Sequence, residues 1–179
     1  MLVALKTETG CNRSAKPFRI LIGGVGLHIL RDMSLGPIFV ERLQKLSWPD
    51  GVEVEDLSYG PVGIMHNLDA REPYDQLVLI GGVNRDRAPG SIHYRRWSGM
   101  LPDEEEVQAR MAEAIAGVVS LDNLLILCGY FKKLPPSVLV IEVEVRDEDW
   151  GEPLSAEVES AYPLIVEELS KRIRESSWD

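Results

Sequence analysis

Three histidines and two aspartates carry the groups in this chain that best suit metal binding or proton transfer: His28, His66, His93, Asp32 and Asp56. Imidazole and carboxylate groups are ligands for zinc or nickel, and paired carboxylates at one sheet edge can act as general acid and base. His28 and Asp32, four residues apart, are the expected neighbours. The alternative is structural, because Asp32 and Asp56 can instead accept hydrogen bonds from turn amides.

A glycine turn precedes these residues. Gly24 and Gly26 follow an apolar run that begins at Phe18, and their missing side chains allow a tight turn and close backbone approach. The same glycines could open a dinucleotide fingerprint, but Ile29 stands where its third glycine belongs. The sequence contains neither the phosphate-loop motif Gly-x-x-x-x-Gly-Lys-Ser/Thr nor the nucleophile motif Gly-x-Ser-x-Gly.

The segments that must position these groups alternate between short apolar runs and helical periods, a pattern typical of a parallel or mixed sheet covered by helices. We predict an α/β fold: a single three-layer domain with a mixed, largely parallel sheet and helices on both faces. Residues 1–17 are expected to be a leader, and 18–179 the domain. The predicted strands are 18–23, 52–57, 76–81 and 138–145, with 20–22, 77–80 and 138–143 in the interior, and the predicted helices are 35–46, 60–68, 103–118 and 155–173.

Composition narrows the function classes. The chain has 179 residues, 45% of them hydrophobic, enough for one sizeable core. Its net charge of −10 disfavours nucleic acid and anionic membranes as partners. Cys11 and Cys128 have no metal-site spacing, and Cys128 follows an apolar run in which a buried hydrophobic role is expected. No segment reads as a signal peptide or membrane span, so we expect a cytoplasmic protein.

The segment 18–36 resembles the opening motif of the [NiFe]-hydrogenase maturation proteases. In that family an apolar strand ends in Gly-x-Gly-Asn, and an acidic pair and a glycine follow at the start of the first helix. Here Asp32 and Gly36 keep their places, whereas Leu27 replaces the asparagine and Met33 the second acid. The resemblance continues, in the order of the elements, to about Arg174.

The resemblance also implies where a metal site would lie. Active members bind the nickel of a hydrogenase large-subunit precursor through three ligands and then remove its C-terminal extension. The corresponding positions here are Met33, Gly81 and Gly117, and no histidine follows His93. A methionine thioether is a poor substitute for a hard oxygen donor. We therefore expect no catalytic residue, metal ligand or cofactor at these degenerate positions.

The residues that remain as candidates for the cleft are Gly24, Gly26, His28, Asp32 and Asp56. The leading interpretation is a non-proteolytic protein that binds or assists a [NiFe]-hydrogenase large-subunit precursor. One alternative is an active endopeptidase that uses His28, Asp32 and Asp56 as displaced ligands. Another is an unrelated small-ligand module on the same fold. The sequence leaves open whether the protein is an enzyme.

Overall fold

The computed structural model describes residues 18–178, so the expected leader and Cys11 lie outside the described residues. Five strands form one sheet in the order β2-β1-β3-β5-β4, in which β4 alone runs antiparallel to its neighbour. The strands are β1 (Ile20–Val25), β2 (Val52–Asp56), β3 (Gln76–Val83), β4 (Ile92–Arg96) and β5 (Ser137–Glu144). The helices are the 3-10 helix η1 (Arg31–Ser34), α1 (Leu35–Leu43), α2 (Pro61–Asp69), α3 (Glu104–Ile115), α4 (Leu121–Tyr130), α5 (Ala156–Glu159) and α6 (Ala161–Glu175).

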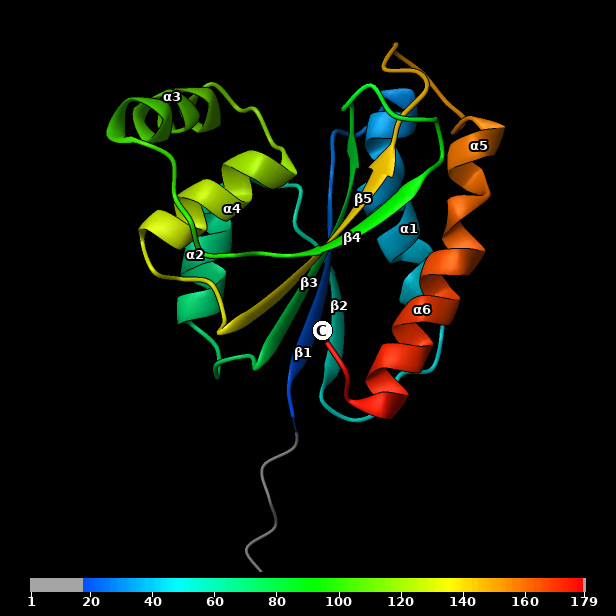
Figure 1. Ribbon diagram of the computed structural model, residues 1–179, viewed down its shortest axis with the longest axis horizontal. Coiled ribbons are helices and arrows are strands. Elements are labelled where there is room, and N and C mark those ends of the chain that lie inside the picture. Colours follow the sequence, from blue (N-terminus) through cyan, green and yellow to red (C-terminus); the bar gives the residue numbers. More distant parts are fainter. Residues whose placement is uncertain (1–17, 179) are drawn as a thin grey trace, which may run out of the picture.

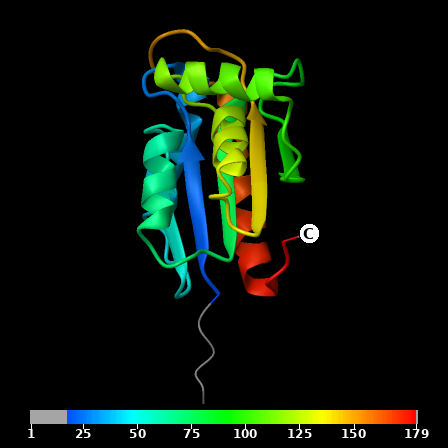
Figure 2. The ribbon, with the colours of Figure 1, turned by 90° about the vertical axis from the view of Figure 1, so that its left-hand side faces the viewer.

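Helices cover both faces of the sheet, which confirms the predicted three layers. Figure 1 shows α1, α5 and α6 on one side and α2 and α4 on the other. Two hydrophobic clusters correspond to these sides, one built around Phe39 of α1 and Ile165 of α6, the other around Ile64 of α2 and Leu124 of α4. Helix α3 packs on α4 and is set apart from the sheet in Figure 1; Figure 2, viewed from that side, shows α3 in front of the strands.

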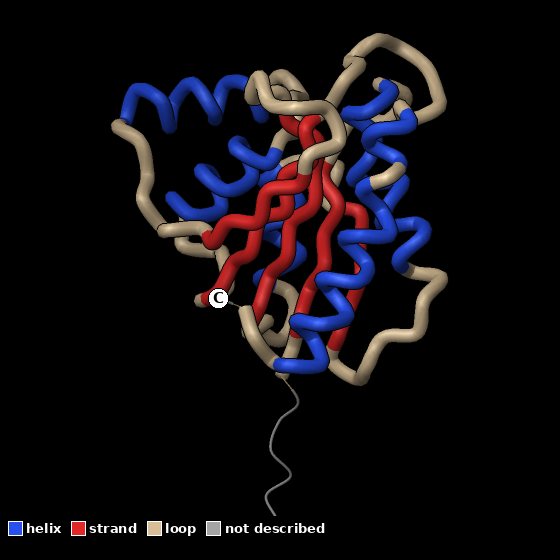
Figure 3. Tube along the Cα trace, turned by 45° about the vertical axis from the view of Figure 1, so that its right-hand side comes forward, coloured by secondary structure: helices blue, strands red, loops and turns tan. Residues whose placement is uncertain are grey.

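Strand side chains alternate between the two clusters, as the pleat requires. Ile20 and Ile22 of β1 join the α1 and α6 side, whereas Leu21 joins the α2 and α4 side. The residues 20–22, 77–80 and 138–143 are all buried, so the prediction of interior strands is confirmed. Figure 3 shows these strands lying between the helices.

Several predicted helix boundaries were wrong. Helix α1 ends at Leu43, and Leu46, predicted on its apolar face, is 41% exposed. The helical period predicted to continue to residue 118 ends at Ile115, which is exposed. The start of α3 follows the expected rule, because Asp103 caps it by accepting a hydrogen bond of 2.9 Å from the Glu106 backbone. None of the helices in residues 18–178 is both long and apolar enough to cross a bilayer.

Candidate functional site

The glycine turn after β1 brings the backbone of α1 against the sheet. A Cβ on Gly24 would overlap the carbonyl group of Gly36, and a Cβ on Gly36 would overlap the backbone of Val25. A Cβ on Gly26 would likewise meet the Met33 carbonyl oxygen, which accepts a hydrogen bond of 3.0 Å from the backbone of the turn. These glycines therefore serve close packing of backbone on backbone.

Asp32 is fully buried and organises two loops at the carboxyl end of the sheet. Its Oδ2 accepts hydrogen bonds from the Arg146 backbone at 2.9 Å, the Asp147 backbone at 3.1 Å and the Ser155 hydroxyl at 2.8 Å. Its Oδ1 accepts from the Ser155 backbone at 2.7 Å. The interpretation of Asp32 as a residue that binds turn amides is confirmed, and its four bonds leave it poorly placed to hold a substrate proton.

His28 pairs with an aspartate, but not with the one expected. Its Nε2 lies 3.3 Å from Oδ2 of Asp56, and both side chains face solvent, with exposed fractions of 67% and 39%. Oδ1 of Asp56 accepts a hydrogen bond of 2.9 Å from the Ser58 backbone. The predicted pair of His28 with Asp32 is wrong, because Asp32 turns into the protein and binds the loop after β5. A single sequence carries no signal for the longer-range pair with Asp56.

The other titratable groups named from the sequence do not join this pair. His66 is exposed on α2, and His93 is exposed on β4. Within residues 18–178, no group of three or more histidine, cysteine, aspartate and glutamate side chains could hold a metal ion. Cys128 is buried as predicted, and burial raises the pKa of its thiol to about 12, so the thiol is protonated at neutral pH.

The degenerate positions Met33 and Gly81 face different parts of the core. Met33 packs against the cluster that contains Leu35. A Cβ on Gly81 would lie 2.9 Å from Cγ of Leu121, in the other cluster, and 2.9 Å from the Val25 carbonyl oxygen. The first side chain of α4 therefore fills the space beside Gly81, which leaves little room for a larger residue there.

Gly117 does not open a helix. It lies after α3 with φ +87°, a conformation that favours glycine. Helix α4 begins four residues later at Leu121, and the Ser120 hydroxyl caps it by accepting a bond of 3.2 Å from the Asn123 backbone. If the family's histidine position is instead placed at the start of the helix, it falls near Ser120, where this chain also has no histidine.

Sequence reasoning missed a charged network beside the start of α4. Glu142, near the end of β5, accepts bonds of 2.8 Å from both Arg87 and Arg95. Glu144 accepts a bond of 2.9 Å from Arg87, and Asp122 in the first turn of α4 accepts two from Arg85, at 2.8 and 2.9 Å. A usable signal was present: two glutamates at alternate positions of an interior strand require cationic partners.

Electrostatics inside this network favours ionised carboxylates. Burial acts to raise the pKa of Glu142, but hydrogen bonds from Arg95 and Arg87 outweigh it and hold that pKa below the usual range. The pKa of Glu144 is also lowered, because the Arg85 and Arg87 contacts outweigh its burial. The network ties α4, β4 and β5 together.

No protein-family model and no curated protein matches the sequence. Solved structures do match. The endopeptidase HybD of E. coli, a hydrogenase maturating enzyme, aligns with TM-score 0.66 and 22% identity, over 89% of this chain and 94% of its own. A hydrogenase 2 maturation peptidase from Thaumarchaeota archaeon SCGC_AB-539-E09 aligns with TM-score 0.62 and 24% identity, over 87% and 97%. The [NiFe] hydrogenase maturation protease HycI from Thermococcus kodakarensis KOD1 gives TM-score 0.66 and 18% identity, over 88% and 93%.

This chain has the hydrogenase maturation endopeptidase fold. On that fold, the glycine turn, Asp32, the His28 and Asp56 pair and the charged network all lie at or beyond the carboxyl ends of the strands. Ligands bind there in open α/β sheets. The predicted fold class is thereby confirmed by both the sheet topology and the comparison.

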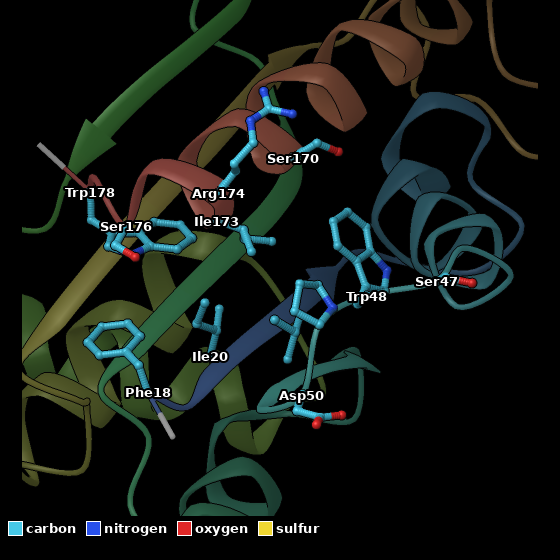
Figure 4. A pocket seen from close by; sticks show the side chains of 12 residues that line it. Phe18, Ile20, Ser47, Trp48, Asp50, Ser170, Ile173, Arg174, Ser176 and Trp178 are labelled. Atoms are coloured by element: carbon cyan, nitrogen blue, oxygen red, sulfur yellow. The ribbon is translucent and has the colours of Figure 1, made fainter. Parts of the chain in front are cut away.

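A cavity of this endopeptidase fold lies at the opposite end of the sheet. It has a volume of about 520 Å³ and is lined by Ile20 and Val52, the first residues of β1 and β2. Figure 4 shows Trp48 and Trp178 on opposite sides of it, with Ile173 between them. Its described lining residues include one carboxylate, Asp50, and no histidine or cysteine, so they hold no acid and base pair suited to hydrolysis.

Proposed function

We propose that this protein is a hydrogenase maturation endopeptidase-like protein that binds a [NiFe]-hydrogenase large-subunit precursor without cleaving it. The fold likeness supports the family, since it extends over nearly the whole length of the solved endopeptidases. The absence of a fitting ligand set within the described residues supports the loss of cleavage.

One observation carries the proposal: Leu121 occupies the space beside Gly81. A metal there would need an oxygen or nitrogen donor from this position, and glycine supplies none. Met33 offers a soft thioether that packs against an apolar cluster, and Gly117 offers no side chain. Nickel therefore does not fit these residues.

The endopeptidase alternative is weakened by the position of Asp32. Its two oxygens accept four hydrogen bonds from the loop after β5, and the residue is fully buried. This leaves His28 and Asp56 as the exposed pair, two side chains where three ligands were expected. If any cleavage is found, His28 and Asp56 are the residues to substitute.

The test mixes the full chain with the large-subunit precursor from the same genome. Association is measured by biolayer interferometry, and the C-terminal extension is followed by mass spectrometry. We expect association with no release of the extension above the rate for precursor alone. Efficient release by this protein would overturn the non-proteolytic assignment, and lack of association would overturn the proposed partner.

The variant His28→Ala gives the matched control, because His28 is exposed and its loss should leave the fold intact. We expect that this variant, like the wild-type protein, does not release the extension. If the wild-type protein releases the extension and His28→Ala abolishes that release, the displaced-site endopeptidase replaces our proposal.

A further inference from the structure

Two loops at the carboxyl end of the sheet are bound to each other. The Arg31 backbone donates a hydrogen bond of 3.0 Å to the Gly151 carbonyl, and the Gly151 backbone donates one of 2.9 Å to the Ile29 carbonyl. The Arg31 guanidinium also pairs with the Asp147 carboxylate at 2.8 Å. Because Asp32 also accepts hydrogen bonds from the Arg146 and Asp147 backbones, the loop after β1 and the loop after β5 are joined at several points and form one unit.

This unit exposes two apolar side chains. Trp150 is 74% exposed and Ile29 is 55% exposed, and the bond from Gly151 to Ile29 places their backbones side by side. Neither is needed to fill the core. We call this pair the Ile29–Trp150 tip. An exposed tryptophan on a fixed loop is a typical anchor in a protein interface, since it buries a large area at a low entropic cost.

Backbone strain accompanies the tip. Ile29 has φ +63°, a left-handed conformation that is rare for a β-branched residue, and Arg31 follows with φ +32°. Such strain is unfavourable and persists only where the surrounding structure fixes it. Here the bonds to Gly151 and the contacts of Asp32 fix it. The loop therefore presents Ile29 to solvent at an energetic cost to the fold.

Acidic residues flank Trp150 in the sequence. Asp149 and Glu152 are exposed, and within residues 18–178 neither forms an ion pair. Glu148, also exposed, accepts a hydrogen bond of 2.7 Å from the Asn84 side chain. A complementary partner surface therefore offers an apolar recess bordered by lysine or arginine side chains.

We propose that the Ile29–Trp150 tip is the surface through which this protein anchors the hydrogenase large-subunit precursor, with Trp150 inserted into an apolar recess bordered by basic side chains. This inference rests on the proposed function. The tip lies at the same end of the sheet as the glycine turn and the charged network, so a precursor bound there covers the whole carboxyl edge.

The test measures precursor binding to immobilised full-length protein by biolayer interferometry. Trp150→Ala should weaken the affinity at least about 30-fold, since a central tryptophan anchor contributes 2 kcal/mol or more. Trp150→Phe should keep part of the affinity. The control is Phe18→Ala, an aromatic residue that is 51% exposed at the opposite end of the sheet, and it should change the affinity less than about twofold.

The acidic border gives a second readout. The double variant Asp149→Asn and Glu152→Gln should slow association severalfold at low salt and reduce its dependence on ionic strength, with a smaller effect on dissociation. Urea unfolding of each variant confirms that the fold is retained.

The outcomes separate the two proposals. If the wild-type protein binds the precursor and Trp150→Ala binds equally well, the tip is not the anchor, although the proposed function survives. If the wild-type protein does not bind the precursor, the proposed function is wrong, and the proposed anchor is wrong with it. Loss of binding by both Trp150→Ala and Phe18→Ala would also overturn the assignment, because it would show no preference for the tip.

Discussion

At the carboxyl edge of the sheet, loops distant in sequence are bound to one another through Asp32 and through the charged network, and Leu121 fills the space beside Gly81. At the amino edge, the C-terminal turn leaves a cavity of about 520 Å³ between Trp48 and Trp178. The cavity is lined mainly by apolar side chains, whereas the buried carboxylates Asp32, Glu142 and Glu144 lie at the other edge.

The comparison of the two edges shows that the volume of a cavity does not by itself indicate a functional site. A cavity lined mostly by apolar side chains offers few directed polar groups. The carboxyl edge instead holds buried carboxylates and strained backbone, which are costly unless other interactions fix them. We conclude that interactions between distant loops fix the backbone at the carboxyl edge, and substitutions at the two edges measure how strongly they differ.

The largest effect is expected from Asp32→Ala. The change removes an acceptor from four hydrogen bonds at a fully buried site and leaves their donors without partners. We expect the free energy of unfolding to fall by about 3–5 kcal/mol. Urea denaturation gives the value. As a control, Asp75→Ala removes one exposed bond of 2.8 Å to the Arg19 backbone and should cost about 1 kcal/mol. Equal losses would show that the two edges are similarly organised.

The second prediction concerns the space beside Gly81. Gly81→Asp should destabilise the fold by about 2–4 kcal/mol, because its Cβ meets Leu121 and the Val25 carbonyl and its charge is buried. In a double-mutant cycle, adding Leu121→Ala should recover about 1 kcal/mol or more relative to additivity. Gly129→Ala, with no neighbour nearer than 3.4 Å, should be neutral or stabilising. Full additivity would contradict the assignment of Leu121 as the occupant.

The third prediction is the pH dependence of the charged network. The folded pKa of Glu142 is lowered, so its contribution is present above the unfolded value of about 4.3 and is lost as the pH falls through the folded value. At pH 7, Glu142→Gln should cost about 2 kcal/mol, since bonds to charged groups are stronger. Below pH 4.5 the difference from wild type should shrink. Parallel stability curves for the two proteins would show that Arg87 and Arg95 do not stabilise the anion.

The sequence predicted the fold because local patterns specify it. The continuous apolar run of β3 indicates a central strand, and the glycines after β1 predict a tight turn. The residue at the end of α1 was misplaced because Leu46 continues the apolar period beyond the last helical turn. A period cannot by itself locate the end of a helix.

The candidate site was predicted less well because its contacts join distant segments. Asp32 binds residues 146, 147 and 155, more than 110 positions away, and no local pattern encodes such a partner. His28 lies four residues from Asp32 but pairs with Asp56 across two strands. The network around Glu142 carried a local signal, the alternation of acidic residues in an interior strand, but its three arginines come from another part of the chain.

The smallest effect is expected at the amino edge. Trp178 is 8% exposed and its Nε1 is buried with no acceptor among residues 18–178, whereas Nε1 of Trp48 donates a bond of 2.8 Å to the Leu43 carbonyl. Trp178→Phe removes a buried donor that has no partner, which is favourable, but it also removes packing contacts. The two effects should nearly cancel, so the free energy of unfolding should change by less than about 0.5 kcal/mol. Trp48→Phe loses a made bond and should cost about 1 kcal/mol more. Urea unfolding followed by far-ultraviolet circular dichroism compares the two variants. A larger loss of stability for Trp178→Phe than for Trp48→Phe would show that the Trp178 indole has an acceptor. It would also show that the amino edge is as closely organised as the carboxyl edge.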